Sequence, residues 1–200
     1  MTKNELNEFV LKLPKRILLV IDAAYAEYIT KKNYSSGEDL VKRNNNVIMT
    51  RTFSKIYGLA GLRIGWAYCS KYIVDIFNRT RLPFNVNKVA TEAAGVAIKD
   101  KNFYAKSVKH NNHYLNWLSK EITKLGLTPI PSVANFILVK FPNKGKFTAK
   151  NVNNYLLSKG IILRRVDNYG LQDFLRISIG KKKELIKLIK LLKIYFKKEL

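Results

Sequence analysis

The chain has 200 residues, 47% of them hydrophobic, which is enough to bury one sizeable core or the cores of two small domains. Its 37 lysines and arginines outnumber 14 acidic residues and give a formal net charge of +23. Such a balance is typical of nucleic-acid-binding modules. Here, however, the lysines are spread along the whole chain instead of being clustered, so nucleic-acid binding is a minor alternative.

Several features that the sequence lacks argue against a membrane partner, a disulfide and a metal site. No apolar run reaches the ~18 residues of a membrane span, and the polar first ten residues do not resemble a signal peptide, so we expect a cytoplasmic protein with no membrane partner. Cys69 is the only cysteine, which excludes an internal disulfide and a cysteine metal framework. His110 and His113 have the spacing of one helix face, but no cysteine or carboxylate cluster accompanies them, and we expect no metal site.

The first hundred residues alternate between helical patterns and short apolar runs. Thr2 and Glu5 have the spacing of a capping box, which predicts a short helix that ends before Pro14. The β-branched and leucine-rich run 17–21 predicts a buried parallel strand. Further strands are expected at 47–51 and 64–68, and helices at 37–42, 70–80, 87–99 and 101–125.

Asp22 directly follows the run 17–21. Ligands of open parallel α/β sheets lie at the carboxyl ends of the strands, which makes an acid at this position a candidate functional residue. A turn or helix-cap role would explain the same residue equally well. The position alone therefore leaves both roles open.

The pattern changes after Pro129 and Pro131. The remaining sequence predicts strands at 135–141, 161–165 and 174–179, and helices at 148–159 and 181–198. The last helix is amphipathic, and its apolar side carries Leu185, Leu188, Leu192 and Tyr195. Its basic face favours a helix that covers an α+β domain over one that lies on a membrane surface.

The stretch 50–65 is the most informative part of the chain. Lys55 follows the hydroxyl residues Thr52 and Ser54 and precedes three glycines, and Arg63 lies eight positions beyond it. Hydroxyls and a guanidinium are donors that bind phosphate, and glycines let the backbone approach a ligand closely. The stretch therefore indicates an anion-binding turn with an amine inside it. It does not match the nucleotide-binding patterns G-x-x-x-x-G-K-[ST] and G-x-G-x-x-G.

The full pattern S-K-x-x-G-L-A-G-L-R-x-G closely resembles the cofactor-lysine segment of pyridoxal-phosphate (PLP) aminotransferases of fold type I, and it is most similar to their histidinol-phosphate branch. The resemblance extends from about residue 13 to the end of the chain. It implies an α/β fold of the PLP-dependent transferase type I. In that fold a partial large domain, residues 1–100, is followed by a small α+β domain, residues 101–200.

The resemblance implies roles for the residues around the lysine. Lys55 would form the Schiff base with PLP and later shuttle a proton between substrate and cofactor. Asp22 occupies the position whose carboxylate keeps the pyridine nitrogen protonated, so that the ring acts as an electron sink. Tyr25 occupies the position that donates to the 3-oxygen of the ring. The positions that bind the cofactor phosphate are matched by Thr52, Ser54 and Arg63.

Two arginines of the C-terminal half match substrate-binding positions. The segment 174–180 resembles the one whose arginine, here Arg176, grips the substrate α-carboxylate. The segment 160–164 resembles the one with a second arginine, here Arg164, which in the histidinol-phosphate branch helps to bind the substrate phosphate. An arginine inside an apolar strand needs a partner, so Arg176 is harder than Arg164 to explain as a surface cation.

The chain also departs from the family. Ala23 replaces the acid that usually follows the strand-end aspartate. The N-terminal portion of the family is not matched; it holds a phosphate-binding loop, a stacking aromatic and an arm toward the partner subunit. We therefore expect a truncated or split chain that binds PLP weakly on its own. As partner we expect a second copy, in a homodimer, or the missing N-terminal half.

The activity that the resemblance implies is transamination between histidinol phosphate and 2-oxoglutarate in histidine biosynthesis, which makes the substrate a small amino acid. A phosphothreonine decarboxylase or an aromatic aminotransferase would share most of these residues. An inactive aminotransferase remnant and a basic nucleic-acid-binding module are the alternatives from other classes.

Overall fold

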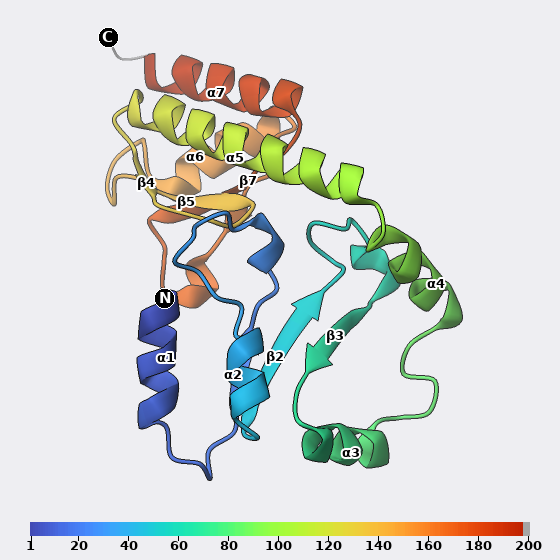
Figure 1. The fold of residues 1–200 in the computed structure, drawn as a ribbon. Coiled ribbons are helices and arrows are strands. Elements are labelled where there is room, and N and C mark those ends of the chain that lie inside the picture. The colour runs from blue at the N-terminus through green and yellow to red at the C-terminus, as the bar shows by residue number, and fades with distance from the viewer. Residues whose placement is uncertain (198–200) are drawn as a thin grey trace. The chain divides into compact units, whose positions relative to one another are not determined.

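The computed structural model describes residues 1–197, and the chain divides into two compact units, Met1–Val108 and Lys109–Leu200 (Figure 1). The boundary between the units falls inside the long helix α5, Lys101–Thr123. The expected domains 1–100 and 101–200 stay a prediction. In the described part of the chain, no helix has both the length and the hydrophobicity needed to cross a bilayer.

The first helix of the N-terminal unit, α1 (Lys3–Lys12), begins at the predicted capping box. The Thr2 hydroxyl accepts from the Glu5 N–H at 3.3 Å, and the Glu5 carboxylate accepts from the Thr2 N–H at 2.6 Å. Both orphan donors of the first turn are thereby satisfied. Leu6 and Val10 of this helix are buried in the core of the unit.

Three strands form the sheet of the N-terminal unit, in the order β1-β2-β3. Strand β1 (Leu19–Asp22) runs parallel to β2 (Val47–Thr52), and β3 (Gly65–Tyr68) runs antiparallel to β2. Figure 1 shows β2 and β3 side by side. The parallel pairing places the carboxyl ends of β1 and β2 at the same edge of the sheet, because Asp22 pairs with Thr50.

The central strand is buried, whereas the outer strands are not. Val47 and Met49 of β2 have no exposed surface, but Val20 of β1 is 54% exposed and every residue of β3 is exposed. The expectation of a buried strand at 17–21 was therefore wrong for this chain. In the described residues each outer strand has a single neighbour, so its other edge is unpaired.

Helices and short 3₁₀ turns connect the strands of this unit. In chain order they are η1 (Ala26–Tyr28), α2 (Glu38–Arg43), η2 (Ala60–Leu62), α3 (Lys71–Thr80) and α4 (Lys88–Ala97). Ser70 stands at the N-cap of α3, but its hydroxyl donates to the Asn45 carbonyl at 3.1 Å and not to the helix. The core cluster combines α1, α2, β2 and the segment after β1.

The C-terminal unit is built on a four-stranded antiparallel sheet in the order β4-β5-β7-β6. The strands are β4 (Thr128–Ile130), β5 (Phe136–Lys140), β6 (Arg164–Arg165) and β7 (Phe174–Ser178). The sequence did not predict β4, because it contains Pro129 between two further turn signals. Proline is tolerated there because β4 is an edge strand.

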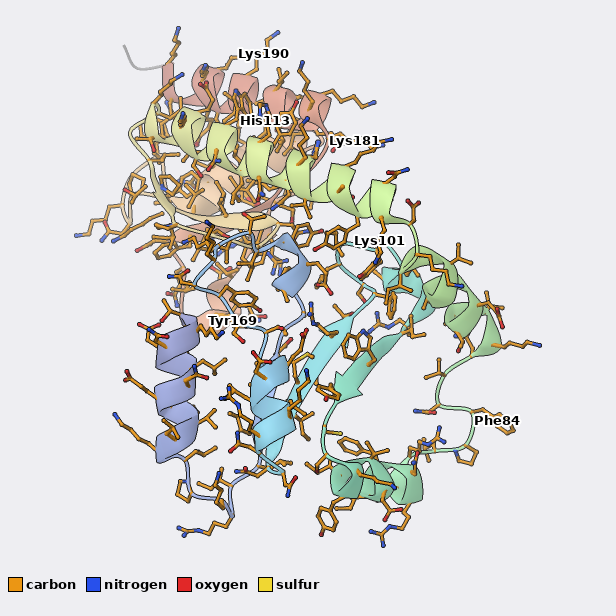
Figure 2. All side chains as sticks on the ribbon, in the orientation of Figure 1. Phe84, Lys101, His113, Tyr169, Lys181 and Lys190 are labelled. Carbon is orange, nitrogen blue, oxygen red and sulfur yellow. The ribbon has the colours of Figure 1, made fainter. Side chains whose placement is uncertain are left out.

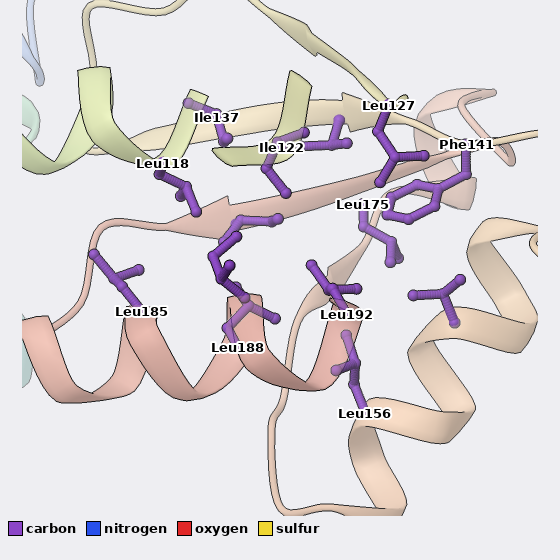
Figure 3. Close-up of a cluster of buried hydrophobic side chains, with 14 of the residues drawn as sticks. Leu118, Ile122, Leu127, Ile137, Phe141, Leu156, Leu175, Leu185, Leu188 and Leu192 are labelled. Atoms are coloured by element: carbon purple, nitrogen blue, oxygen red, sulfur yellow. The ribbon is translucent and has the colours of Figure 1, made fainter. Parts of the chain in front are cut away.

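The C-terminal part of α5, α6 (Ala149–Ser158) and α7 (Lys182–Lys197) supply the apolar side chains that pack against this sheet. Figure 3 shows Leu118 and Ile122 of α5 facing the strands, with Leu188 of α7 in the same cluster. Leu185, Leu188 and Leu192 are buried, which confirms the predicted apolar side of the last helix. Its predicted end at residue 198 lies outside the described residues. A short turn, η3 (Asp167–Tyr169), precedes β7.

Candidate active site

Asp22 ends β1, and its carboxylate is exposed at the edge of the sheet where β1 and β2 both finish. Its Oδ1 atom accepts from the Ala24 N–H at 3.0 Å, which fixes the turn after the strand. The Ala23 N–H donates to the Thr50 carbonyl at 3.0 Å and continues the pairing by one residue. The aspartate thus combines the turn role and the strand-end position that the sequence left open.

Tyr25 and Lys55 approach each other although they are thirty positions apart in the sequence. Tyr25 directly precedes η1, and the half-buried Lys55 lies in the turn after β2. The Lys55 Nζ atom lies 5.1 Å from the centre of the Tyr25 ring, within the range of a cation–π contact. The amine is therefore held beside a phenol, close to where β1 and β2 end.

The predicted phosphate-binding residues flank this amine along the chain. Thr52 ends β2, and its hydroxyl accepts from the Ser54 N–H at 3.0 Å, which makes a tight turn before Lys55. Arg63 follows η2, and the Phe53 N–H donates to the adjacent Ile64 carbonyl at 3.2 Å. The backbone of Arg63 therefore lies near the hydroxyl turn, while its exposed guanidinium donates to the Ala60 carbonyl at 2.7 Å.

Backbone conformation marks the same loop. Arg63 has a φ of 54°, one of two non-glycine residues in the left-handed region among those described. That conformation costs an L-residue about 1–2 kcal/mol, and such strain concentrates at functional sites. Gly65 is required by close approach, because a Cβ there would stand 2.7 Å from the Arg51 carbonyl oxygen. At Gly61 a Cβ would meet no described atom within 4 Å, so this glycine shows no such close approach.

Sequence reasoning missed a buried ion-pair cluster beside this loop. The Arg51 guanidinium donates to Glu27 and to Glu38, each at 2.9 Å, and it lies over the Trp66 ring at 5.9 Å. The Arg51 and Glu27 side chains are only 14% and 8% exposed. The available signal was an arginine inside strand β2, since a charge at such a position needs a partner.

The pKa values of two tyrosine hydroxyls near the cluster are shifted. Burial raises the pKa of the Tyr57 hydroxyl, and the Glu27 carboxylate nearby raises this pKa further. Burial also raises the pKa of Tyr34, while the Arg51 guanidinium counteracts the increase. The Tyr104 hydroxyl donates to the Glu27 carbonyl at 3.1 Å. Glu27, Arg51, Tyr57 and Tyr104 all line one cavity of about 460 Å³.

Arg164 and Arg176 face each other in the C-terminal unit. They are direct partners in the antiparallel pair of β6 and β7, so both side chains project from the same face of the sheet. Both line a cavity of about 410 Å³ next to α7. The Arg176 guanidinium lies 5.0 Å from the centre of the Phe136 ring, and its Nε atom is buried without a hydrogen-bond partner.

No described carboxylate pairs with either of these two arginines. The neighbouring Arg165 differs, because its guanidinium binds both oxygens of Asp167, with Nε at 2.7 Å from Oδ2. This hydrogen bonding lowers the pKa of Asp167 and raises that of Arg165. Like charges directly opposite in a sheet repel, so the Arg164–Arg176 pair is an arrangement that an anion would stabilise.

The histidines have structural roles. The His110 Nε2 atom lies 2.9 Å from the Gly180 carbonyl oxygen, and the Tyr114 ring packs against His110 and His113. Among residues 1–197, no group of three or more histidine, cysteine, aspartate or glutamate side chains could hold a metal ion. Exposed lysines occur in both units, among them Lys101 in the first and Lys181 and Lys190 in the second (Figure 2).

The fold is that of PLP-dependent aminotransferases of fold type I. A profile of the aminotransferase class I and II family matches residues 1–192. The chain therefore belongs to the aminotransferase class I and II family, as the lysine segment predicted.

Two curated relatives with similar sequences carry the same enzyme name. The histidinol-phosphate aminotransferase of Maricaulis maris is 46% identical over 185 residues, which are 92% of this chain and 51% of that protein. The enzyme of the same name from Paramagnetospirillum magneticum is 51% identical over 165 residues, covering 82% of this chain and 45% of that protein. The chain spans about half the length of the curated relatives it matches.

Solved structures show the same fold. The histidinol-phosphate aminotransferase from Sinorhizobium meliloti, solved in complex with pyridoxal-5′-phosphate, superposes with a TM-score of 0.86 at 29% identity and covers 98% of this chain and 53% of its own. The L-threonine-O-3-phosphate decarboxylase from Porphyromonas gingivalis gives a TM-score of 0.83 at 24% identity over 99% of this chain and 60% of that one. The latter likeness concerns the fold alone.

Proposed function

We propose that this chain carries the lysine-bearing part of a PLP-dependent aminotransferase that moves an amino group between histidinol phosphate and 2-oxoglutarate, a step of histidine biosynthesis. The observation that carries the proposal is the Lys55 amine 5.1 Å from the Tyr25 ring, close to where β1 ends on Asp22. Relatives 46–51% identical that bear the name histidinol-phosphate aminotransferase support this substrate.

The residues present fit PLP. The exposed Asp22 carboxylate is suited to a protonated ring nitrogen, and the Tyr25 hydroxyl to the 3-oxygen. The doubly charged phosphate would be held by donors on the loop between β2 and β3, namely Thr52, Ser54 and Arg63. The strained backbone of Arg63 supports this assignment, since strain of that kind persists where the surroundings fix it for a function.

When bound, PLP supplies an aldehyde carbon for covalent attachment and a ring that withdraws electrons from the substrate. Lys55 would supply the amine that holds this cofactor and would take and return the proton on the substrate Cα. Asp22 would supply the carboxylate that accepts a hydrogen bond from the protonated ring nitrogen. Tyr25 orients its phenol beside the Lys55 amine.

The proposed reactants are all anions: histidinol phosphate carries a phosphate, and glutamate and 2-oxoglutarate each carry two carboxylates. The C-terminal unit offers two cations on one face of its sheet. Arg176 has a buried Nε without a partner and a guanidinium stacked on Phe136, so it is pre-oriented to bind a carboxylate with two parallel hydrogen bonds. Arg164 is exposed and directly opposite, where it can receive the phosphate. We assign the α-carboxylate of glutamate or 2-oxoglutarate to Arg176 and the phosphate of histidinol phosphate to Arg164.

Phosphothreonine decarboxylation is the second candidate, because its substrate carries both a carboxylate and a phosphate and could use both arginines. The likeness to the Porphyromonas gingivalis decarboxylase, at 24% identity, concerns the fold and does not separate the two reactions. The relatives named histidinol-phosphate aminotransferase are about twice as similar in sequence, which favours transamination. Aromatic amino acids would leave Arg164 without a phosphate to bind.

We also propose that the protein works in the cytoplasm and as an assembly, either a homodimer or a complex with a chain that covers the open strands. Support comes from the exposed residues of β3 and from Phe84, which is 97% exposed, as Figure 2 illustrates. Exposed apolar surface of this kind is typical of interfaces. Nucleic-acid binding is disfavoured, because the exposed lysines are scattered over both units.

The test is borohydride trapping. The chain is incubated with PLP, reduced and digested, and the modified lysine is located by mass spectrometry. We expect label on Lys55 and not on exposed lysines such as Lys190; K55R serves as the negative control. Label spread evenly over the lysines would refute the proposal. Assays with histidinol phosphate plus 2-oxoglutarate, with phosphothreonine and with tyrosine then decide among the substrates.

A further inference from the structure

The ion pair between Glu27 and Arg51 links the two segments that carry Tyr25 and Lys55. Glu27 lies in η1, two positions after Tyr25, and Arg51 lies in β2, four positions before Lys55. The Glu27 Oε1 atom and the Arg51 Nη1 atom are 2.9 Å apart. The contact therefore connects the segment that carries Tyr25 with the segment that carries Lys55.

Glu27 and Tyr57, which lies two positions after Lys55, line the same cavity. Burial raises the pKa of the Tyr57 hydroxyl, and the Glu27 charge raises it further. Tyr57 in turn packs on Phe53, with ring centres 5.0 Å apart. The carboxylate thus faces residues on both sides of Lys55 in the sequence.

Other contacts hold the pair itself in place. The Arg51 Nη2 atom binds the Glu38 carboxylate of α2 at 2.9 Å. The Tyr104 hydroxyl of α5 donates to the Glu27 backbone carbonyl at 3.1 Å. The Arg51 guanidinium also lies over the Trp66 ring of β3. Contacts from α2, α5 and β3 therefore fix the position of a single charge pair.

Stability alone explains the pair poorly. The Oε2 atom of Glu27 and the Nε atom of Arg51 are buried without hydrogen-bond partners among the described residues. A buried ion pair with unsatisfied atoms is no more stabilising than well-packed apolar residues, because desolvation offsets the attraction. What the pair provides, and apolar residues would not, is a fixed direction between η1 and β2.

We propose that Glu27 and Arg51 are positioning residues that hold the Tyr25 ring against the Lys55 amine. The inference rests on the proposed function for the roles of Tyr25 and Lys55. Neither Glu27 nor Arg51 touches the reacting atoms in this assignment. Each acts through the backbone of the segment that carries the functional side chain.

The experiment measures the reactivity of Lys55 without PLP. The 200-residue chain is labelled with limiting acetic anhydride, and mass spectrometry gives the labelling rate of Lys55 relative to the exposed Lys190. In E27Q and R51M we expect this ratio to rise about two- to fivefold, the size of one cation–π contact between an amine and a ring. R51K, which keeps the charge, should restore most of the wild-type ratio.

R79M is the matched control, because it removes the arginine of the exposed Asp75–Arg79 pair; its Lys55 ratio should equal that of the wild type. All labelling is done well below the thermal transition of each variant, and E27Q, which keeps the size of the side chain, covers the case in which R51M fails to fold. An unchanged ratio in folded E27Q would overturn the inference. Labelling of Lys55 and Lys190 that rises in parallel would also overturn it.

Borohydride trapping with PLP on the same variants separates this inference from the proposed function. If the wild type is trapped at Lys55 but the labelling ratios do not change, the function stands and the positioning role is wrong. If the ratios change but wild-type trapping is not specific for Lys55, the geometric link stands and the cofactor assignment is wrong.

Discussion

Arg51 of the N-terminal unit and Arg176 of the C-terminal unit both lie inside strands, yet their surroundings differ. Arg51 binds two carboxylates, whereas Arg176 stacks on Phe136, faces another arginine and has no described carboxylate partner. A charge that the fold already neutralises is part of the scaffold. A partly buried charge without a described counterion can bind an anion, which is the role that we propose for Arg176.

Two carboxylates of the N-terminal unit differ in the same way as the two arginines. Glu27 is 8% exposed and paired with Arg51, whereas Asp22, five positions earlier, is exposed and engages a backbone N–H. We expect D22N to leave the fold intact and to lower turnover about a thousandfold or more, because a charged hydrogen bond to the ring nitrogen is lost in the transition state. Single-turnover absorbance of the active enzyme that contains this chain measures the effect. Turnover within tenfold of the wild type would remove Asp22 from the mechanism.

The next largest effect should come from replacing Arg51, whose charge is neutralised within the fold. R51M leaves Glu27 buried with an uncompensated charge, and we expect the free energy of unfolding to fall by about 3–5 kcal/mol. Urea denaturation measures this loss. R79M, whose partner Asp75 is 67% exposed, should change stability by less than about 0.5 kcal/mol. Similar losses in the two variants would contradict the distinction between buried and exposed pairs.

On the ligand side, R176M should lower kcat/KM about a hundredfold with little change in unfolding free energy, because no described carboxylate loses its partner. R176K keeps the charge but cannot make two parallel hydrogen bonds to a carboxylate, so we expect an intermediate loss of kcat/KM. Steady-state kinetics of the active enzyme and a thermal melt of each variant test the two halves of this prediction. A large drop in melting temperature would place Arg176 with the scaffold.

Arg164 offers a sharper form of the same test. If it binds the substrate phosphate, R164M should raise KM for histidinol phosphate about tenfold or more and leave KM for an unphosphorylated amino acid nearly unchanged. Equal increases for both substrates would contradict a phosphate-binding role and would instead indicate general damage to the sheet.

The smallest effect concerns a satisfied carboxylate of the C-terminal unit. Hydrogen bonds from Lys124 at 2.5 Å and Lys193 at 3.0 Å lower the pKa of Glu121 below its ordinary value near 4.5. A carboxylate with a depressed folded-state pKa contributes stability above its unfolded pKa, and this contribution disappears as pH falls through the folded pKa. Thermal melts between pH 7 and 2.5 should therefore show a shallower decline for E121Q than for the wild type. An identical decline would mean that the two lysines do not stabilise the charge.

The sequence predicted those parts of the molecule that depend on local chemistry. The capping box at Thr2, the strand ending on Asp22 and the apolar side of the last helix are set by neighbouring residues, and all three are present. The approach of Tyr25 to Lys55 agrees with the rule that parallel strands end at one edge. These features needed no knowledge of distant contacts.

Features that depend on distant contacts were missed. The Glu27–Arg51–Glu38 cluster joins three segments, and no spacing rule connects an acid in a turn with an arginine 24 positions later. Strand β4 was missed because its proline is tolerated only at an edge, and edges are set by the order of strands. The strand at 17–21 was expected to be buried because its residues are apolar. Composition shows that such a strand can be buried, but it does not show whether another element lies beside the strand and covers it.

The pairing of β2 with β3 has a consequence for the order in which the site assembles. Thr52 and Gly65 pair across 13 positions, whereas Leu19 and Val47 of the parallel pair are 28 positions apart. Closing the longer loop costs about 0.6 kcal/mol more entropy, and parallel pairing is intrinsically slow. The loop that carries Lys55 should therefore close before β1 docks and delivers Asp22. During synthesis and refolding the amine would acquire its turn first and its acidic neighbour last.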